Sequence, residues 1–469
     1  MPFPSRLRNF LILFFLLFLI GLPPAWTGKS AENVARLAEQ QNDPARAARL
    51  YELAARHLPW RPVLWQQAGL AALSAGEAEE AVRLLDEARQ RGALTFSGQI
   101  ALGQALWQGD RKQEAVTVWE STLAASGPDP ELLGHLIKAY HALGRYADEQ
   151  KLLQCLLSIH PQDAEVHYRL ALLLSTSQPE SALKELMEAI RLNPILDTKL
   201  QPMRRALNLA LLSDEPAYRL TVTGQGLAAV DEWDLARQAF VQAVRFHPAY
   251  AEAWAWLGEA DQHLGRDGTA ALEQAEALNP DSALVQVFLG LHDQRQGHTA
   301  QAVQHFWLAA NLEPENAIWQ AALAEAYVQD GNLPLALDAY QRAVQIDPRE
   351  PQYWRMLAAF CAVYEYQISE IGLPAARRAL ELSPGDAQAL DVMGQIYLAL
   401  GNQSLAENYF QQAIKADPAL AEAYLHLGVI YLQTGQMVLA REAFQHSAGL
   451  AAGMPVGEQA QMLLRQYFP

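Results

Sequence analysis

Apolar and small residues recur along this chain at helical spacing, and the pattern repeats itself about every 34 residues. Gly394 and Gly428 are 34 residues apart, and so are Phe410 and Phe444. The prolines that follow these runs keep nearly the same interval, with steps of 32 to 36 residues over the stretch 248–418. A fixed period of this length is typical of an array of similar structural units, each too small to bury its apolar side alone.

Within one period the pattern predicts two helices joined by a short turn. The first helix carries a bulky residue, then Leu-Gly or Leu-Ala, then often Tyr, and a glycine turn follows, as at Gly331 and Gly401. The second helix carries Ala, an aromatic residue four positions later and another Ala three positions after that. Steps of four and three place these residues on one helix face, and the proline that follows ends the helix.

This order of residues resembles the tetratricopeptide repeat family. The segments "ALDVMGQIYLALGNQSLAENYFQQAIKADP" and "AALAEAYVQDGNLPLALDAYQRAVQIDP" follow the family's Trp–Leu–Gly–Tyr…Ala…Phe…Ala…Pro order, and the likeness extends from about Lys29 to Gly449 in about 12 units. The resemblance implies an all-α fold, a right-handed α-solenoid superhelix of helix-turn-helix repeats. Its concave face would be lined by the first helix of each repeat.

The resemblance also explains glycine inside a helix, where it costs about 1 kcal/mol relative to alanine. In this family the two helices of a repeat cross closely at that point, and we expect each glycine to face a small residue of the second helix. The expected pairs are Gly69 with Ala81, Gly103 with Ala115, Gly224 with Ala236, Gly258 with Ala270, Gly290 with Ala302, Gly394 with Ala406, and Gly428 with Ala440. One repeat departs from this pattern, because Glu149 occupies its small position.

The period and its interruptions predict five segments. Residues 1–27 are a signal peptide or transmembrane anchor, and residues 28–194 are an N-terminal block of repeats. Residues 195–216 break the period and are read as an extra helix or a degenerate repeat. A second block covers residues 217–455, and residues 456–469 form a helix that caps the last repeat.

The N-terminal segment has the order of an export signal. Arg6 and Arg8 precede an unbroken apolar run from Phe10 to Ile20 that continues to Leu22. As a helix this run spans about 20 Å, short of the roughly 30 Å hydrocarbon core, which favours a cleaved signal. The alternative is an uncleaved anchor, which would use the longer uncharged stretch of residues 9–28. In both cases the basic flank stays in the cytoplasm and the repeats are extracytoplasmic, either secreted or held at the membrane through residues 10–22.

The composition excludes some classes of partner and chemistry. The net charge is −17, so the surface repels phosphate backbones and nucleic acid is not expected as a partner. The two cysteines, Cys155 and Cys361, form no metal or disulfide pattern. The stretch "TVTGQGLAA" matches a GxGxxA fingerprint, but its first glycine, Gly224, falls at the repeat position and no βαβ pattern follows. We therefore expect no enzyme activity, no cofactor site and no metal site.

The remaining chemistry is recognition on the first helices. The resemblance places ligand contacts at a set of positions on their concave side, where basic residues are too few for the family's carboxylate clamp. These candidates are Gln104, Trp107, Lys138, His141, Tyr168, Gln225, Glu259, Gln262, Gln294, Arg295, Glu325, Arg355, Asp391 and Gln395. We expect a scaffold that binds partner proteins or peptides in this groove. The alternative is a glycan-binding accessory protein in envelope polysaccharide assembly or export, with Trp107 as a sugar contact.

Overall fold

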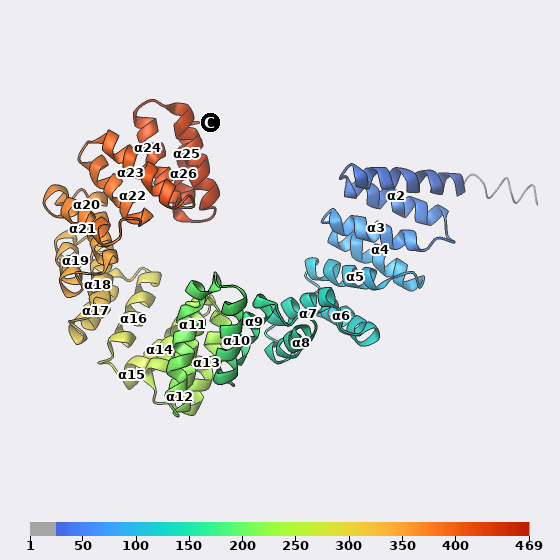
Figure 1. Ribbon diagram of the computed structural model, residues 1–469, viewed down its shortest axis with the longest axis horizontal. Helices are drawn as coiled ribbons and strands as arrows, with labels where there is room; N and C mark the ends of the chain where they lie inside the picture. Colours follow the sequence, from blue (N-terminus) through green and yellow to red (C-terminus); the bar gives the residue numbers. More distant parts are fainter. Residues whose placement is uncertain (1–24, 469) are drawn as a thin grey trace, which may run out of the picture. The chain divides into compact units, whose positions relative to one another are not determined.

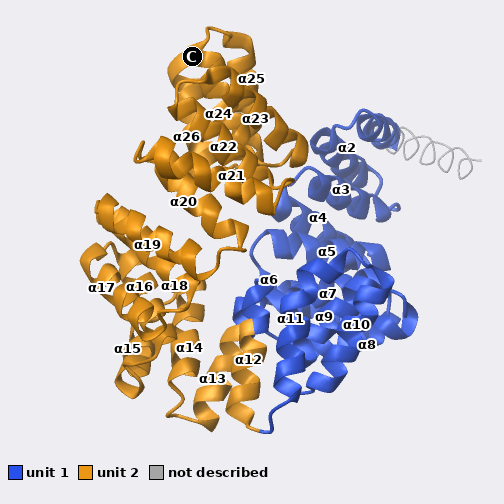
Figure 2. Cartoon of the chain, turned by 60° about the vertical axis from the view of Figure 1, so that its left-hand side comes forward, with its two compact units in different colours: residues 1–214, 226–235 blue, residues 215–225, 236–469 orange. Residues whose placement is uncertain are grey.

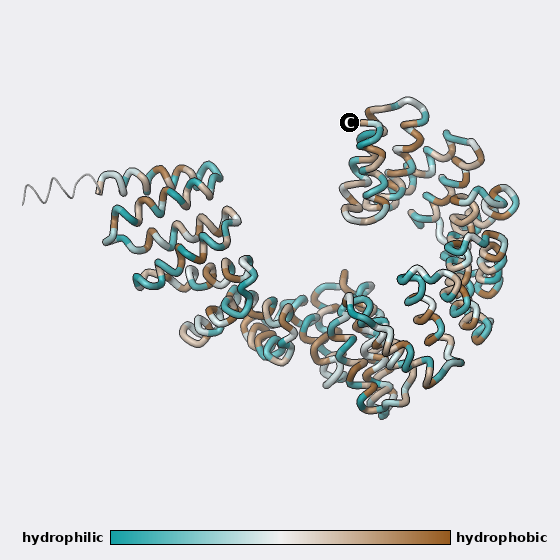
Figure 3. The backbone as a smooth tube through the Cα atoms, turned by 180° about the vertical axis from the view of Figure 1, so that it is seen from behind, coloured by the Kyte–Doolittle hydropathy of each residue, from teal (hydrophilic) through white to brown (hydrophobic). Residues whose placement is uncertain are grey.

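The computed structural model describes residues 25–468, and within this range every regular element is helical. Residues 25–40 form the first helix, and later helices follow as antiparallel pairs along the chain (Figure 1). Hydrophobic and hydrophilic residues are interspersed along the helices, as the hydropathy colouring in Figure 3 shows. The prediction of an all-α solenoid of helical hairpins is confirmed.

The chain divides into two compact units (Figure 2). Unit 1 contains residues 1–214 and 226–235, and unit 2 contains residues 215–225 and 236–469. The helices of unit 1 after residues 25–40 are α2 (Pro44–His57), α3 (Val63–Ser74), α4 (Ala78–Gln90), α5 (Phe96–Gln108), α6 (Lys112–Ser126), α7 (Pro130–Ala142), α8 (Tyr146–Ile159), α9 (Ala164–Leu174), α10 (Pro179–Leu192) and α11 (Leu196–Leu211).

Two helices, α12 (Pro216–Ala229) and α13 (Trp233–Phe246), contain residues of both units. The GxGxxA stretch lies in α12, so it belongs to a helix and not to a strand followed by a phosphate-binding turn. The remaining elements of unit 2 are α14 (Ala251–His263), α15 (Thr269–Leu278), α16 (Ala283–Gln296), α17 (Thr299–Leu312), α18 (Ala317–Gln329), α19 (Leu333–Ile346), α20 (Pro351–Val363), the π-helix η1 (Ile368–Gly372), α21 (Leu373–Leu382), α22 (Ala387–Ala399), α23 (Gln403–Ala416), α24 (Ala421–Gln433), α25 (Met437–Leu450) and α26 (Pro455–Tyr467).

Helix boundaries follow from local chemistry. Asp386 begins α22 by accepting hydrogen bonds from the backbone N–H groups of Gln388 and Ala389, at 2.9 and 3.1 Å. The turn after α22 contains Gly401 with a φ of +77°, a conformation that side chains with a Cβ disfavour. The same left-handed turn recurs at Gly331 and Gly435, so the repeat is visible in the backbone angles themselves.

The glycines inside the first helices allow close approach of the second helix, but their nearest neighbour is not the predicted alanine. A Cβ placed on Gly394 would lie 2.5 Å from Phe410, and one on Gly428 would lie 2.6 Å from Phe444. The glycine therefore receives the bulky residue four positions after Ala406 or Ala440. This corrects the expected Gly–Ala pairing, and the same holds at Gly69, Gly103, Gly224 and Gly290, which face Leu85, Trp119, Phe240 and Phe306.

Two irregular repeats adjust locally. Only 32 residues separate Pro248 from Pro280, and in this shortened repeat the predicted small residue Ala270 is exposed while Gly268 lies against the backbone of Gly258. The step from Pro348 to Pro384 is 36 residues, and this longer repeat contains η1, which a left-handed Gln367 precedes. The period therefore tolerates insertions and deletions at the hairpin turns.

The segment predicted as an irregular or degenerate break, residues 195–216, contains one 16-residue helix, α11. Pro202 lies in its interior, and Leu200, Met203, Ala206, Leu207 and Ala210 are buried. Ala206 packs closely against Gly226 of α12. Residues 196–211 of this segment are therefore regular helix packed on its neighbour.

No helix within residues 25–468 is both long enough and apolar enough to cross a membrane. The predicted signal or anchor, including residues 10–22, lies outside the described residues.

Candidate functional site

Polar side chains of neighbouring repeats are joined by hydrogen bonds between positions about one repeat apart. In unit 1 the Gln104 amide lies 2.7 Å from His135 Nε2. In unit 2 Arg295 bonds to Glu259, and His426 bonds to Asp391. The sequence separations of these pairs are 31, 36 and 35 residues. Many predicted groove residues therefore contact the next repeat.

Three predicted residues meet in a cluster on α14 and α16. Arg295 donates to both carboxylate oxygens of Glu259, at 2.5 and 2.7 Å, and to Gln262 Oε1 at 2.7 Å. Glu259 is 4% exposed, so its charge is compensated inside the protein. The hydrogen bonds to Glu259 raise the pKa of Arg295. Glu259 therefore orients Arg295 and is not itself open to a ligand.

A second cluster lies in unit 1 around the residue that breaks the repeat pattern. Glu149 on α8 is fully buried, and Arg169 on α9 donates to its Oε1 at 2.8 Å. The predicted groove residue His141 also contacts Arg169, and its Nδ1 lies 3.4 Å from Glu149 Oε2. Arg169 donates to Glu232 at 2.6 Å as well. Sequence reasoning missed Arg169, although an acid in a small buried position signals a buried cation nearby.

The predicted sugar contact Trp107 is half-buried and packs on aromatic neighbours. Its ring lies 6.1 Å from that of Trp119, and the Lys112 ammonium lies 5.8 Å from its centroid. The Trp119 ring in turn stacks on His135 at 5.3 Å. These contacts give Trp107 a packing role.

The other candidates are dispersed. Tyr168 is 5% exposed and lies under the Lys199 ammonium at 5.3 Å. Gln225 and Gln294 are half-buried, and Lys138 and Glu325 are exposed.

A small hollow in unit 2 is lined by three successive first helices, α20, α22 and α24. It brings the predicted residues Arg355 and Asp391 together. We call it the α20–α24 hollow. Its volume is about 230 Å³, and its lining is Arg355, Met356, Ala359, Gln388, Asp391, Val392, Leu420 and Glu422. Arg355 points its guanidinium to Gln388 Oε1 and lies 3.5 Å from Asp386 Oδ2. Its charge is therefore partly compensated within the protein.

The acidic side of the hollow is ordered by its neighbours. Asp391 is 4% exposed and accepts hydrogen bonds from Gln395 and His426, both at 2.8 Å. Burial by itself would lower the pKa of His426, but the Asp391 carboxylate raises it above its usual value. Gln395, another predicted residue, thus holds Asp391 in place. The exposed carboxylate of Glu422 lies on the same hollow.

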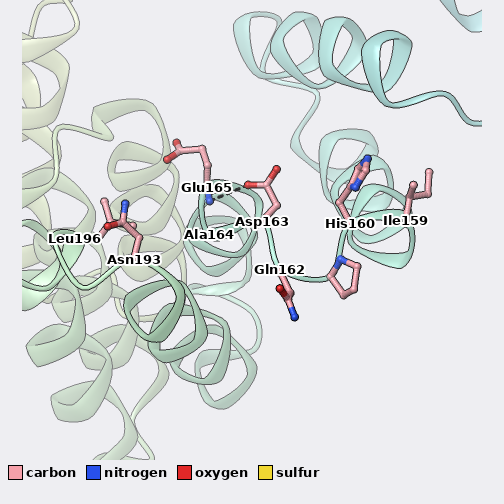
Figure 4. Close-up of a pocket in the computed structure, with 9 residues that line it drawn as sticks. Ile159, His160, Gln162, Asp163, Ala164, Glu165, Asn193 and Leu196 are labelled. Carbon is pink, nitrogen blue, oxygen red and sulfur yellow. Dashed lines mark hydrogen bonds between the residues drawn. The ribbon is translucent and has the colours of Figure 1, made fainter.

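Larger hollows lie at the turns between repeats. One, of about 680 Å³, is lined by the α8–α9 turn and by Asn193 and Leu196 of the α10–α11 turn (Figure 4). A second, of about 630 Å³, has the same construction at residues 313–318 and 346–353. In the first, Asp163 is occupied in capping α9. Because the same geometry occurs at two separate pairs of turns, we do not take these hollows as the site.

Within residues 25–468 no group of three or more His, Cys, Asp or Glu side chains is placed to hold a metal ion.

A family model described as tetratricopeptide repeat matches residues 66–130, 100–164, 289–351 and 392–455. These segments are tetratricopeptide repeats. The α20–α24 hollow adjoins the last of them, and Asp391, Val392 and Glu422 come from that repeat or from the residue before it. The prediction of this repeat type is confirmed.

Two curated proteins are similar to the chain. Human "Tetratricopeptide repeat protein 6" is 24% identical over 192 residues, which are 40% of this chain and 36% of that protein. "Anaphase-promoting complex subunit 3" of Schizosaccharomyces pombe is 21% identical over 316 residues, 64% of this chain and 42% of that protein. The chain thus spans 36–42% of the length of these relatives.

Among solved structures, yeast Tom70 aligns over 94% of this chain and 95% of its own with a TM-score of 0.42 and 17% identity.

Proposed function

We propose that this protein is a non-catalytic scaffold that binds partner proteins through the first helices of its tetratricopeptide repeats. The observation that carries the proposal is the α20–α24 hollow, where three successive first helices supply both apolar and charged side chains. The similarity to a protein named as a subunit of the anaphase-promoting complex supports an assembly role. An extended peptide laid across such a surface gains specificity from the side chains that enter its hollows.

The lining indicates which side chain would enter. Met356, Val392 and Leu420 give an apolar floor, and the exposed Glu422 gives a carboxylate at the rim, whereas both oxygens of Asp391 are already bonded to Gln395 and His426. Because Arg355 already contacts Gln388 and Asp386, it offers little to an incoming acid. A Lys or Arg of the partner would lay its methylene chain on the floor and place its charge at the acidic rim. The net charge of −17 would steer such a basic partner.

Site-specific photo-crosslinking in cells tests this function. A photoreactive amino acid at Ala359 in the hollow should form adducts with a defined partner protein. The same amino acid at the exposed Gln412 of α23 is the matched control. Glu422→Lys should abolish the Ala359 adducts while leaving thermal unfolding unchanged. Equal adduct patterns from both positions, or adducts that survive Glu422→Lys, would count against the hollow as the binding site.

We further propose that the repeats lie outside the cytoplasm, either secreted or tethered through residues 10–22. The support is the order of Arg6, Arg8 and the apolar run that follows. An alkaline phosphatase fused after Lys29 should be active, because this reporter folds only outside the cytoplasm. An inactive phosphatase together with a fluorescent cytoplasmic reporter at the same position would reverse the assignment. Mass measurement of the native N-terminus then separates the anchored form from the cleaved form.

A further inference from the structure

The N-terminal hairpin, formed by residues 25–40 and α2, exposes two tryptophans. Trp26 is 79% exposed and Trp60 is 64% exposed, which is unusual for the largest apolar side chain. A Cβ on Gly28 would lie 2.6 Å from Leu58 Cγ, so the start of the first helix touches the end of α2. Trp26 and Trp60 are each two residues from this contact. Both therefore lie at the end of the hairpin where the chain arrives from residue 24.

This end of the hairpin is also basic. Glu32 is fully buried, and three cations surround its carboxylate: Lys29 at 3.0 Å, Arg36 at 2.6 Å and Arg61. One carboxylate against three cations leaves a local excess of positive charge. Residues 25–63 contain six Lys or Arg and four Asp or Glu, whereas the whole chain carries −17. The sign of the charge is thus reversed where the tryptophans are exposed.

Tryptophan favours the boundary between water and lipid, because its ring is apolar and its N–H is polar. Each Lys or Arg near an anionic bilayer contributes about 1 kcal/mol of attraction. Only Pro23, Pro24 and Ala25 separate Trp26 from the apolar residues 10–22. The exposed aromatics, the reversed charge and the sequence position all indicate the same neighbour, the surface of a lipid bilayer.

We propose that the Trp26–Trp60 end of the N-terminal hairpin rests on an anionic phospholipid bilayer. The inference rests on the proposed tethering through residues 10–22. The two rings would enter the interfacial layer, and Lys29, Arg36 and Arg61 would face the lipid phosphates. The first repeat would then be fixed at the bilayer surface.

The test uses the full chain reconstituted into vesicles of phosphatidylcholine and phosphatidylglycerol that contain brominated lipids, which quench nearby tryptophans. The double variant Trp26→Ser/Trp60→Ser should lose more than half of the quenching. The matched control is Trp307→Ser, which removes a tryptophan that is 50% exposed on α17 and should retain the quenching. Flotation after an alkaline wash reports, independently, whether residues 10–22 anchor the chain.

The outcomes separate the two proposals. If the wild-type chain fails to float, the tether is wrong and the surface placement falls with it. If the chain floats but the double variant is quenched as strongly as Trp307→Ser, the surface placement alone is overturned. Quenching that is unchanged in vesicles of phosphatidylcholine alone would overturn the role of the basic residues. Quenching that is lost in the double variant and weaker without phosphatidylglycerol supports the proposal.

A spin label supplies a second measurement, which tests the Trp60 site without relying on the double variant. In a Cys155→Ser background, a label on Trp60→Cys should be more accessible to oxygen than to a polar nickel reagent. A label on Gln41→Cys, exposed in the turn at the other end of the hairpin, should show the reverse. Equal accessibility at both positions would overturn the placement.

Discussion

At the scale of single residues, the glycines of the first helices are required by what faces them. A Cβ on Gly394 would lie 2.5 Å from the Phe410 ring, which is fully buried and has no room to move. Gly394→Ala should therefore lower the free energy of unfolding by about 1 kcal/mol net, because overpacking exceeds the gain in helix propensity. Gly134 of α7 has no neighbour within 4 Å of its Cβ position, so Gly134→Ala is the matched control. Urea denaturation should show stabilisation there, and destabilisation by both substitutions would refute the packing account.

The buried pair Glu149–Arg169 predicts an asymmetry between its two partners. Arg169→Ala leaves the fully buried Glu149 without its cation and should cost about 3–5 kcal/mol. Glu149→Ala restores the small residue that other repeats have at this position and leaves Arg169 bonded to Glu232. Glu149→Ala should therefore lower the free energy of unfolding clearly less than Arg169→Ala does. The double variant should lose less than the sum of the two single losses. Thermal or urea unfolding of the three variants measures this, and equal costs for the single variants would contradict it.

The pair Asp391–His426 predicts a dependence of stability on pH. Although burial opposes the charged imidazole, Asp391 raises the pKa of His426 above its usual value of 6.5. A raised folded-state pKa gives stability that is fully present below pH 6.5 and is lost as the pH rises through the folded-state value. Unfolding midpoints of the wild type should fall across this window, and the contribution from this pair should vanish in Asp391→Asn. An identical pH profile for the two proteins would show that the pair is not coupled.

At the scale of elements, α26 closes the array by covering the last hairpin. Ala460 is fully buried, and Leu463, Leu464 and Phe468 pack on the cluster that contains Phe444. Leu464→Asp should cost about 2 kcal/mol or more, because it removes apolar burial and places a charge against an apolar face. Met462 on the same helix is 58% exposed, so Met462→Asp is the control and should change the melting temperature little. Equal effects would mean that α26 does not cover the hairpin through this face.

The hairpins could be predicted from the sequence because each one is specified locally. Spacings of three and four, a left-handed glycine turn and a helix-ending proline all act within one repeat, and the structure has each of them. The nearest neighbour of Gly394 differs from the prediction, because spacing identifies a face but not which residue of that face reaches furthest across. The atoms nearest to a Cβ on Gly394 belong to Phe410 and not to Ala406.

The candidate site was less predictable because its contacts join different repeats. Glu259 and Asp391 were expected at the groove surface, yet Arg295 and His426 of the following repeats cover them. Nothing within one repeat predicts this. The available signal is a pair of complementary side chains about one period apart, since residues at equivalent positions of adjacent repeats lie side by side. Glu149 illustrates the limit, because its mismatch with the period was visible while its partner Arg169 was not.

At the scale of the whole molecule, the larger helix contacts given for the described residues are between helices that are adjacent or one helix apart along the chain. Stability in such an array is a sum of terms from each repeat and from adjacent pairs, so damage should remain local. Gly428→Leu, which forces a side chain into the Phe444 ring, should increase amide hydrogen exchange in α24, α25 and α26. Exchange in α3 to α6 should stay at the wild-type level, because these helices belong to the other compact unit. Hydrogen exchange followed by mass spectrometry resolves both regions in one experiment. A uniform loss of protection from α3 to α26 would instead require one cooperative core, which contacts between successive neighbours do not provide.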